Sequence, residues 1–440
     1  MMEYERKYKW LPYKILRFFV VALLILTFLG PVNYKFDIFF GFLMVLYILA
    51  FLLVTWYGML KASHYRAQWF VGDSRKHTLI FLIKLATIVT LIVKIGLVLS
   101  SVAIYGLPEM SNVADMMAES YTDLFYEEGD KNIFRQIDTF LKFVYYFSTF
   151  AGIFWRKKLP KIFMIIICVN VLLDLFYNVC YIGTQRMIIT IALVLLTQLL
   201  VSSVGGNLRI NKKKLRRVAL LVGVMAVFFV SVLSARKELW ADGEVYWNTT
   251  QYDYDNFLLI LFTSNKTKYD VCKLVSYMTQ GFYGLSLAMQ TPPQWTFMLG
   301  SVRGINSIVS QVFPFIPNMV GLTYPVRAGK VFGMDGLASW YTIFPWLASD
   351  LGWIGALIYM GFVGWLFMRC WIQAVEYDNP LAFTLLVLLV IQYAFLVANN
   401  QLFIDRGESV ATVFFLLMYW LYGKGCNFEK RKPEIQSTGV

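Results

Sequence analysis

Long apolar stretches dominate the pattern of hydrophobic and polar positions along the chain. A membrane-spanning helix needs about 20 mostly apolar residues, because lipid offers no hydrogen-bond partner to exposed backbone groups. Ten stretches follow this rule, of which the first and last are short. They are residues 15–30, 36–60, 79–104, 137–155, 161–182, 184–202, 216–234, 345–369, 380–400 and 408–423. The pattern predicts an all-α polytopic membrane protein with about ten transmembrane helices.

The connectors between these stretches differ greatly in length. Residues 235–344 are far too long for a simple connection, so this segment needs structure of its own. Within it, 256–262 and 271–289 have the pattern of apolar-faced helices that lie against a membrane. We therefore expect three parts: a bundle of seven transmembrane helices over 1–234, a large extracytoplasmic loop domain over 235–344, and three transmembrane helices with a basic cytoplasmic tail over 345–440.

The composition agrees with a membrane protein. Of 440 residues, 58% are hydrophobic and 15% are charged, whereas a soluble domain has about 45–50% apolar and about 25% charged residues. A cytosolic enzyme, a disordered scaffold and a secreted disulfide-rich module are therefore excluded. The five cysteines lie far apart without a C-x-x-C pair, which favours small apolar helix residues over a disulfide framework or a zinc site.

The net charge of +13 is explained by where the basic residues lie. With the N-terminus inside the cell, the cytoplasmic connectors hold 24 of the 40 Lys and Arg residues and the outer connectors hold 13. Lys and Arg accumulate in the cytoplasmic loops of membrane proteins. We therefore expect a multi-pass protein of the cytoplasmic membrane with both termini in the cytoplasm, whose basic residues report topology and bind no nucleic acid.

A tight turn between the fifth and sixth expected helices brings an arginine to a helix start. Gly183 permits the chain reversal, Thr184 can cap the next helix, and Arg186 follows in its first turn. A cation is disfavoured at a helix N-terminus, so Arg186 needs a nearby anion or free access to water. Two interpretations are open: a phosphate held by the arginine and the helix N–H groups, or an arginine that reaches the lipid headgroups.

The segment that closes the large loop carries a carboxylate inside an expected membrane helix. Pro345 belongs to the first turn of that helix, which places Asp350 more than one turn into the bilayer. A carboxylate at that depth is costly unless it faces a polar cavity or a cation. Asp350 therefore has either an ion-pair or capping role, or a catalytic or acceptor-orienting role. Four glycines that permit close helix contacts follow: Gly352, Gly355, Gly361 and Gly364.

The turn between the last two expected helices holds one arginine among acids. Asp405, Arg406 and Glu408 follow one another closely there. A local salt bridge and an anion site are both compatible with this pattern.

Three charged residues fall inside the expected spans. Lys94, Lys142 and Asp174 all project to the outer half of the bilayer. Charges within a membrane usually pair with one another. We expect a structural ion pair or pair network here, in preference to a proton relay.

Several common catalytic groups are missing from the outer connectors. Both histidines, His64 and His77, fall in the 61–78 cytoplasmic loop, so no outer histidine can act as a base. There is no P-loop, no G-x-S-x-G motif and no metal-binding cluster in the sequence. Phosphate chemistry at the outer face would therefore depend on arginine and lysine.

Three stretches match the motifs of one protein family. Gly183-Thr184-Gln185-Arg186 resembles a G-S-R-like helix start, with Gln185 where the family commonly has a small residue. The stretch from Tyr341-Thr342 to Gly355 resembles a "yT-f…D-G--G" signature that closes a large outer loop. Tyr283-Gly284-Leu285-Ser286-Leu287 and Gly300 resemble helices of that loop. With this helix layout, the chain resembles the bacterial oligosaccharide repeat unit (O-antigen, Wzy-type) polymerases over most of its length.

The resemblance implies a GT-C-like architecture and glycosyl transfer on the outer face of the bacterial cytoplasmic (inner) membrane, without metal or other cofactor. Two polyprenyl-pyrophosphate-linked oligosaccharides would bind in the lipid bilayer. A hydroxyl of one would attack the anomeric carbon that joins the other glycan to its pyrophosphate. The product would be a surface polysaccharide such as lipopolysaccharide or capsule, and a flippase and a chain-length regulator are the implied protein partners.

The family resemblance and the residue chemistry together give candidate site residues. Pyrophosphate is a good leaving group, so the protein mainly has to position substrates and stabilise developing negative charge. We expect catalytic roles for Asp350, Arg186 and Arg327, with Asp350 orienting or deprotonating the acceptor hydroxyl. Glu408 is the second candidate for that task. The expected substrate-binding residues are Arg303, Lys330, Arg406, Glu408, Trp340 and Tyr341, and no metal ligand is expected.

Two alternative functions stay open. An O-antigen ligase shares the general plan, but a ligase is expected to use an outer histidine, which this sequence lacks. A transporter of polysaccharide or lipid-linked oligosaccharide (a flippase) usually shows internal repeats and broken helices at the membrane midplane. The sequence shows no such repeat, so the polymerase is favoured.

Overall fold

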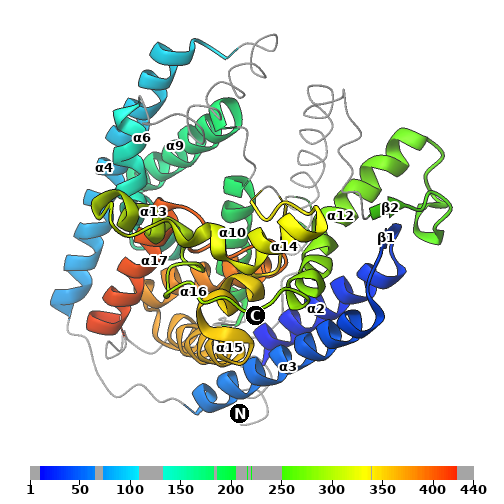
Figure 1. The fold of residues 1–440 in the computed structure, drawn as a ribbon. Helices are drawn as coiled ribbons and strands as arrows, with labels where there is room; N and C mark the ends of the chain where they lie inside the picture. Colours follow the sequence, from blue (N-terminus) through cyan, green and yellow to red (C-terminus); the bar gives the residue numbers. More distant parts are fainter. Residues whose placement is uncertain are drawn as a thin grey trace. The chain divides into compact units, whose positions relative to one another are not determined.

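The computed structural model consists almost entirely of helices (Figure 1). It describes residues 10–64, 73–108, 132–182, 186–204, 216, 220, 250–337 and 339–423. The α-helices are α2 (Leu11–Leu29), α3 (Ile38–Ser63), α4 (Asp73–Tyr105), α6 (Ile133–Phe140), α7 (Lys142–Tyr146), α8 (Gly152–Phe154), α9 (Lys161–Tyr177), α10 (Arg186–Val204), α12 (Asn265–Met289), α13 (Arg303–Val312), α14 (Tyr324–Phe332), α15 (Ile343–Tyr377), α16 (Pro380–Ala394) and α17 (Arg406–Met418). The π-helical turns are η1 (Phe147–Ala151), η2 (Asn178–Ile182) and η5 (Tyr419–Gly423), and the 3₁₀ turns are η3 (Phe257–Leu259) and η4 (Met319–Leu322).

Within the described residues, six helices are long and apolar enough to cross a membrane. They are Leu11–Leu29, Ile38–Ser63, Lys76–Tyr105, Lys161–Ile182, Met187–Val204 and Ile343–Tyr377. These helices support the expected class, an all-α membrane protein, whereas the total of ten spans stays a prediction.

Three of the other four expected spans are not single long helices in the structure. The stretch 137–155 is divided among α6, α7, η1 and α8. The stretches 380–400 and 408–423 contain α16, which ends at Ala394, and α17, which is followed by the π-helical turn η5. All of 216–234 except residues 216 and 220 lies outside the described residues.

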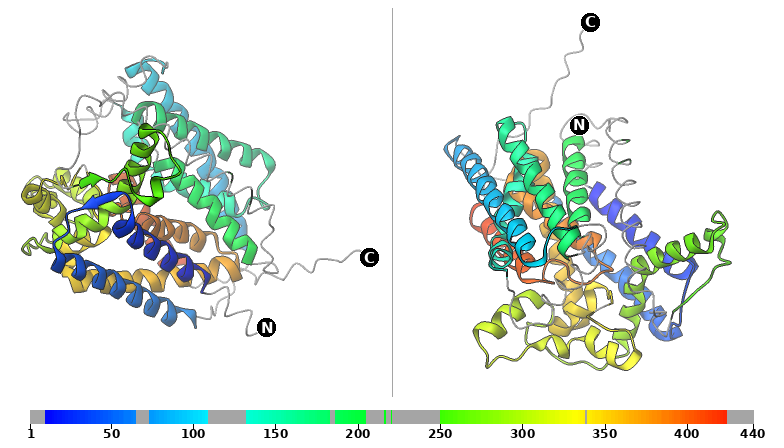
Figure 2. Two further views of the ribbon diagram at one scale, coloured as in Figure 1. Left: turned by 90° about the vertical axis from the view of Figure 1, so that its right-hand side faces the viewer. Right: turned by 90° about the horizontal axis from the view of Figure 1, so that it is seen from above.

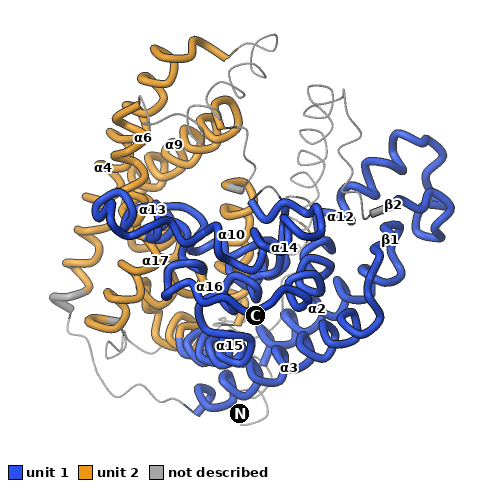
Figure 3. The backbone as a smooth tube through the Cα atoms, viewed as in Figure 1, with its two compact units in different colours: residues 1–65, 240–369, 391–409 blue, residues 66–239, 370–390, 410–440 orange. Residues whose placement is uncertain are grey.

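The chain divides into two compact units, each built from stretches that are distant in the sequence (Figure 3). Unit 1 consists of residues 1–65, 240–369 and 391–409, and unit 2 of residues 66–239, 370–390 and 410–440. The division into 1–234, 235–344 and 345–440 follows chain order and stays a prediction.

In unit 1, α2 and α3 form an antiparallel hairpin that leads into a short two-stranded ribbon (Figures 1 and 2). Asp37 caps α3 by accepting a hydrogen bond from the backbone N–H of Phe40 at 3.1 Å. Between the helices, β1 (Val32–Tyr34) pairs antiparallel with β2 (Thr250–Tyr252). Helix α12 packs against both α2 and α3. The hairpin is thus tied to the segment that precedes α12.

Glycines allow α3 and α15 to approach closely within unit 1. A Cβ atom on Gly58 of α3 would overlap the carbonyl of Gly361 in α15. A Cβ atom on Gly364 would lie 2.7 Å from the carbonyl oxygen of Thr55. The expected role of the glycines in close helix contact is therefore confirmed at Gly364, whereas the close approach to the Gly361 carbonyl depends on Gly58 of the facing helix.

In unit 2, the packing of α4 against α9 buries an ion network. Lys94 and Asp174 are both fully buried and form the expected ion pair. Asp138 of α6 also contacts Lys94, with 2.6 Å between Oδ1 and Nζ. The Tyr145 ring lies 4.7 Å from the Lys94 ammonium and 5.7 Å from that of Lys142. The sequence pattern had not identified Asp138 as a member of this network.

Candidate functional site

Asp350 holds a loop against α15 in unit 1. Its residue is 5% exposed, and its carboxylate accepts three hydrogen bonds from the loop 295–301. The donors are Thr296 Oγ1, the backbone N–H of Gly300 at 3.1 Å and the backbone N–H of Ser301 at 2.7 Å. Three donors satisfy a buried carboxylate well. Of the two roles open for Asp350, this geometry favours the capping role.

The loop 295–301 has an unusual backbone conformation. Phe297 and Met298 adopt positive φ angles of 52° and 64°, which non-glycine residues rarely do. Such conformations persist only where the surroundings hold them, and they cluster at functional sites. Trp295 fixes the start of the loop by donating from Nε1 to the Asp350 carbonyl at 2.8 Å. The loop is therefore a firmly held segment.

The loop leads directly into α13, whose first residue is Arg303. Asn400 donates from Nδ2 to the carbonyl of Ser301 at 2.9 Å. The backbone N–H of Gly304 donates to the carbonyl of Phe403 at 3.0 Å. Ser301 and Gly304 flank Arg303 on either side, so the start of α13 is fixed between Asp350 and the segment before α17.

Arg406 of α17 contacts α13 one turn after Arg303. Arg406, the first residue of α17, donates from Nε at 3.1 Å and from Nη2 at 2.9 Å to the Ser307 hydroxyl. Ser307 lies one turn after Arg303 on the same face of α13. Arg303 places its guanidinium carbon 5.3 Å from the centre of the Trp346 ring. Both arginines are half-buried and begin helices, where a cation is disfavoured unless an anion is near.

Asn399 binds the Trp346 ring, on which Arg303 lies. Its Oδ1 accepts hydrogen bonds from Trp346 Nε1 at 2.9 Å and from the backbone N–H of Tyr341 at 3.0 Å. Its own backbone N–H donates to the carbonyl of Tyr341 at 2.7 Å, and its φ angle is 66°. Asn399 thus orients the ring on which Arg303 lies. The sequence marks this turn for Asp405, Arg406 and Glu408 but does not indicate that Asn399 orients a tryptophan ring.

Tyr341 and Trp340 differ in exposure. Tyr341 is fully buried and donates from its hydroxyl to the Met334 carbonyl at 2.8 Å. Burial raises the pKa of that hydroxyl, so it stays protonated. A Cβ atom on Gly284 would lie 2.8 Å from the Tyr341 ring, which shows how tightly two of the motif segments pack. Trp340 is half-buried and makes an edge-to-face contact with Tyr277 at 4.9 Å.

Arg327 and Lys330 share one face of α14 in unit 1. Arg327 is half-buried and donates from Nη1 to the Pro292 carbonyl at 2.9 Å. Lys330 is exposed in the last turn. The helix begins at Tyr324, whose N–H donates to the Ser349 hydroxyl at 2.9 Å. Ser349 precedes Asp350, so α14 and the loop 295–301 are both anchored at the same turn of α15.

Glu408 lies in the first turn of α17 and is 8% exposed. The backbone N–H of Glu408 donates to Oδ1 of Asp405 at 2.9 Å, so Asp405 caps the helix. A carboxylate at this position interacts favourably with the helix dipole. Glu408 and Arg406 therefore both belong to the first turn of α17.

Arg186 begins α10 in unit 2. Its side chain and residues 183–185 lie outside the described part of the chain. Its role therefore stays a prediction.

Metal binding finds no support in the part of the chain that the structure describes. There, no group of three or more His, Cys, Asp or Glu side chains is placed to hold a metal ion. The chemistry of the described site is that of guanidinium, ammonium and carboxylate groups.

No family model, no curated protein and no solved structure matches the chain. The resemblance to repeat unit polymerases is thus carried by the local motifs and the helix layout alone.

Proposed function

We propose that the protein polymerises polyprenyl-pyrophosphate-linked oligosaccharide repeat units on the outer face of a bacterial cytoplasmic membrane. A hydroxyl of the acceptor glycan forms a bond to the anomeric carbon of the donor glycan. The bond between that carbon and the pyrophosphate oxygen breaks, and the pyrophosphate keeps the electron pair. The hydroxyl proton passes to a carboxylate, for which Glu408 is our candidate.

The observation that carries the proposal is that Arg406 donates twice to Ser307, which follows Arg303 by one turn of α13, while Arg303 lies against the Trp346 ring. Two guanidinium groups on adjoining helix starts form a site for an anion with several oxygens, since guanidinium binds phosphate through two points. Charge that develops on the leaving pyrophosphate would be stabilised there. The hydrogen bonds from Arg406 to Ser307 use Nε and Nη2. We assign the third guanidinium nitrogen, Nη1, to phosphate binding.

Asp350 is assigned to positioning in this proposal. Its carboxylate is engaged by the loop 295–301, and Ser301 of that loop lies two residues before Arg303. A carboxylate that fixes the loop also fixes the start of α13. Asp350, a residue of the signature motif, would then serve catalysis by fixing the backbone at Ser301 and thereby orienting Arg303.

Arg327 and Lys330 are assigned to the second lipid-linked substrate. They add two cations on one face of α14, and Lys330 is exposed to an approaching anion. Trp340, which lies beside Tyr277, offers a half-buried ring edge for a sugar. Tyr341 is too deeply buried for sugar stacking and supports the site from within.

Deletion of the gene, followed by gel analysis of the surface glycan, tests the function. The proposal predicts loss of long chains with a single repeat unit retained, and rescue by the wild-type gene. Loss of all surface glycan with accumulation of lipid-linked polymer would indicate a ligase instead. Loss of every glycan, with lipid-linked repeat units retained inside, would indicate a flippase.

Complementation with variants tests the site. We expect Arg303→Ala and Arg406→Ala to leave long chains undetectable at normal protein levels. Arg156→Ala, which removes an exposed arginine in unit 2, serves as the matched control and should restore long chains. Full chain length with either site variant would overturn the assignment of these arginines.

A further inference from the structure

The loop 295–301 carries an exposed apolar patch in unit 1. Trp295, Phe297 and Met298 are each more than half exposed. The rings of Trp295 and Phe297 lie together, with their centres 4.7 Å apart. The chain from residue 291 to residue 302 contains no charged side chain. Exposed apolar side chains that gather on one segment mark a contact with a membrane or with another molecule.

The backbone of the loop holds these side chains outward. Phe297 and Met298 have positive φ angles of 52° and 64°. Thr296, which lies between the two rings in sequence, is buried and donates to the Asp350 carboxylate. Positive φ angles at such residues are costly and persist only where the surroundings fix them. The loop is therefore built to expose its apolar side chains.

The loop lies where the exposed part of α15 begins. This helix is one of the candidate membrane spans. Its residues 343–350 are all buried, and its backbone departs from helical geometry at Gly352, with φ 68°. An exposed apolar stripe with a spacing of four residues follows the break: Ile354, Ile358 and Phe362. Trp295 donates from Nε1 to the Asp350 carbonyl just before the break, so its ring lies next to the start of this stripe.

The length of α15 places a membrane boundary at this point. Arg369 is the next charged residue after Asp350, and its guanidinium carbon lies 4.6 Å from the centre of the Trp365 ring. Aromatic rings and basic side chains are enriched where a membrane meets water. At a rise of about 1.5 Å per residue, α15 covers about 28 Å from Asp350 to Arg369, close to the hydrocarbon thickness of about 30 Å. With Arg369 at one boundary, the loop 295–301 lies at the other.

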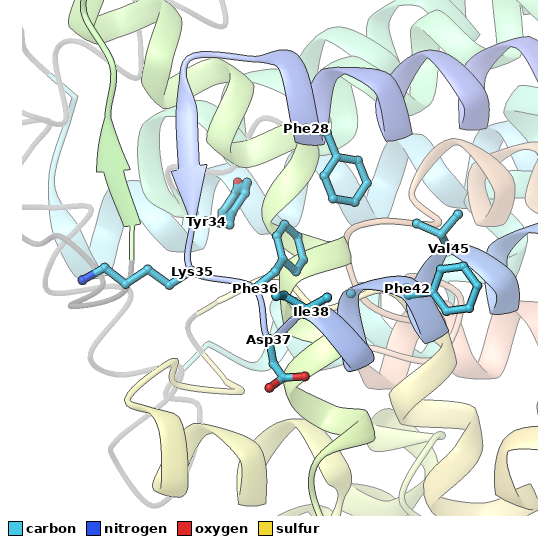
Figure 4. Close-up of a pocket in the computed structure, with 9 residues that line it drawn as sticks. Phe28, Tyr34, Lys35, Phe36, Asp37, Ile38, Phe42 and Val45 are labelled. Carbon is cyan, nitrogen blue, oxygen red and sulfur yellow. The ribbon is translucent and has the colours of Figure 1, made fainter.

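The connector between α2 and α3 has the opposite character. Lys35 and Asp37 are both exposed there, and Lys35 points away from the aromatic side chains of that turn (Figure 4). Exposed charges are costly in lipid. Unit 1 thus contains a charged connector that suits water and an uncharged loop that suits a bilayer.

We propose that the loop 295–301 is a membrane anchor whose apolar side chains enter the boundary between phospholipid headgroups and acyl chains. On the predicted topology this is the outer leaflet. Irregular backbone is excluded from the hydrocarbon core, so the loop itself lies at headgroup depth and only its side chains reach deeper. The Trp295 ring enters lipid without an unpaired donor, because its N–H is bonded to the Asp350 carbonyl.

The surroundings of the loop fit this depth. Arg327 donates from Nη1 to the Pro292 carbonyl at 2.9 Å, so a cation lies at the base of the anchor, on the side of the phospholipid phosphates. Arg303 begins α13 two residues after the loop ends at Ser301. An anchored loop therefore also holds Arg303 at headgroup depth, where a lipid-linked pyrophosphate lies. This last consequence rests on the proposed function, whereas the anchor itself does not.

Spin labels on the full-length protein in phospholipid nanodiscs test the anchor. The labels are placed on Phe297→Cys and Met298→Cys in a background without the native cysteines. Ile358→Cys is the benchmark for lipid, and Lys35→Cys is the benchmark for water. Oxygen concentrates in lipid and a nickel chelate in water, so the ratio of their collision rates measures depth. We expect this ratio at residues 297 and 298 to exceed the ratio at residue 35 several-fold and to approach that at residue 358.

Two outcomes would overturn the proposal. A ratio equal to that of Lys35→Cys would show that the loop lies in water. Protection from both oxygen and the nickel chelate would show that protein, such as a second copy of the chain, covers the loop. Neither outcome would bear on glycan extension, which is measured separately.

Photolabelling of the unmodified protein gives an independent answer. A phospholipid with a photoreactive group near its glycerol should label residues 295–298, and mass spectrometry locates the sites. Residues 354–362 of α15 serve as the internal control, since their exposed stripe belongs to a candidate span. Label on 354–362 without label on 295–298 would contradict the anchor.

Discussion

The backbone N–H of Ser301 donates a hydrogen bond to Oδ2 of Asp350 at 2.7 Å. Two residues later Arg303 begins α13 and lies over the Trp346 ring. The carboxylate of the signature motif and the arginine of the candidate site are thus connected through one short piece of backbone. This connection gives Asp350 a positioning role that can be separated experimentally from proton transfer.

Asp350→Asn and Asp350→Ala should differ in activity. Asparagine keeps one acceptor oxygen for the loop 295–301, whereas alanine leaves three donors unsatisfied, each at a cost of about 1–3 kcal/mol. We expect measurable chain extension with Asp350→Asn and none with Asp350→Ala in a complementation assay. Equal and complete loss in both variants, at normal protein levels, would favour a general base. Thr296→Ala should resemble Asp350→Asn, since it removes one of the same hydrogen bonds.

Replacing Arg406 by alanine should lower the rate of glycan extension more than replacing Ser307 by alanine. Arg406→Ala removes a charge that we assign to the pyrophosphate, and loss of such a group lowers the rate by about 10²–10³-fold. Ser307→Ala removes only the acceptor that orients the guanidinium, so we expect a loss of about tenfold, equal to about 1.4 kcal/mol. Rates of glycan extension by purified protein provide the measurement. A larger effect at Ser307 than at Arg406 would contradict the assigned roles.

Gly284→Ala should destabilise the protein. A Cβ atom at Gly284 lies 2.8 Å from the buried Tyr341 ring, and overpacking of a core costs about 1–3 kcal/mol. Gly321→Ala is the matched control, because a Cβ atom there meets no other atom within 4 Å. Thermal unfolding in detergent should show a lower midpoint for Gly284→Ala and an unchanged one for Gly321→Ala. An unchanged midpoint for both would mean that the two motif segments do not pack as described.

Removing Lys94 alone from the buried ion network of unit 2 should destabilise the protein more than removing Lys94 together with the Asp174 charge. Lys94→Met leaves Asp174 charged and without its cation, and breaking a buried pair in this way costs about 3–5 kcal/mol. Adding Asp174→Asn removes one of the stranded charges, so the double variant should recover part of the lost stability. Protein yield and thermal unfolding would measure this. A double variant that is less stable than Lys94→Met would show that the pair is not coupled.

Cys272 should resist alkylation in the folded protein. Its thiol is buried in α12, and burial raises its pKa from 9.0 to about 11. The folded state therefore favours the neutral thiol: this contribution to stability is complete below pH 9 and is lost as the pH rises through about 11. In a variant with the other cysteines changed to alanine, maleimide should react slowly at pH 8 and rapidly after unfolding. Rapid labelling of folded protein would contradict the burial of Cys272.

Some of these relationships follow from residue type and position alone. Lys94 and Asp174 are both charged inside apolar stretches, and a charge in such a place needs a partner. Gly361 and Gly364 recur at helical spacing in an apolar stretch, which favours close helix contact. In both cases a single physical constraint determines the outcome.

Other relationships depend on packing between distant segments. Asp138 joins the Lys94 network from a helix that sequence patterning merges into one longer span. Ser307 and Asn399 are neutral and polar, so neither stands out until α13 lies beside the segment 399–409. The loop 295–301 turns at Phe297 and Met298, where no glycine marks the positive φ angles. Such features are set by tertiary contacts that a local pattern does not contain.

Reconstitution gives the sharpest test of whether the protein polymerises repeat units with a metal-independent arginine site. Purified protein in liposomes would receive a polyprenyl-pyrophosphate-linked repeat unit in the presence of EDTA, and products would be followed by mass spectrometry. We expect glycans of two and more repeat units, with one polyprenyl pyrophosphate released for each bond formed, and no such products with Arg406→Ala. Unchanged substrate with wild-type protein, or equal extension by Arg406→Ala, would contradict this expectation.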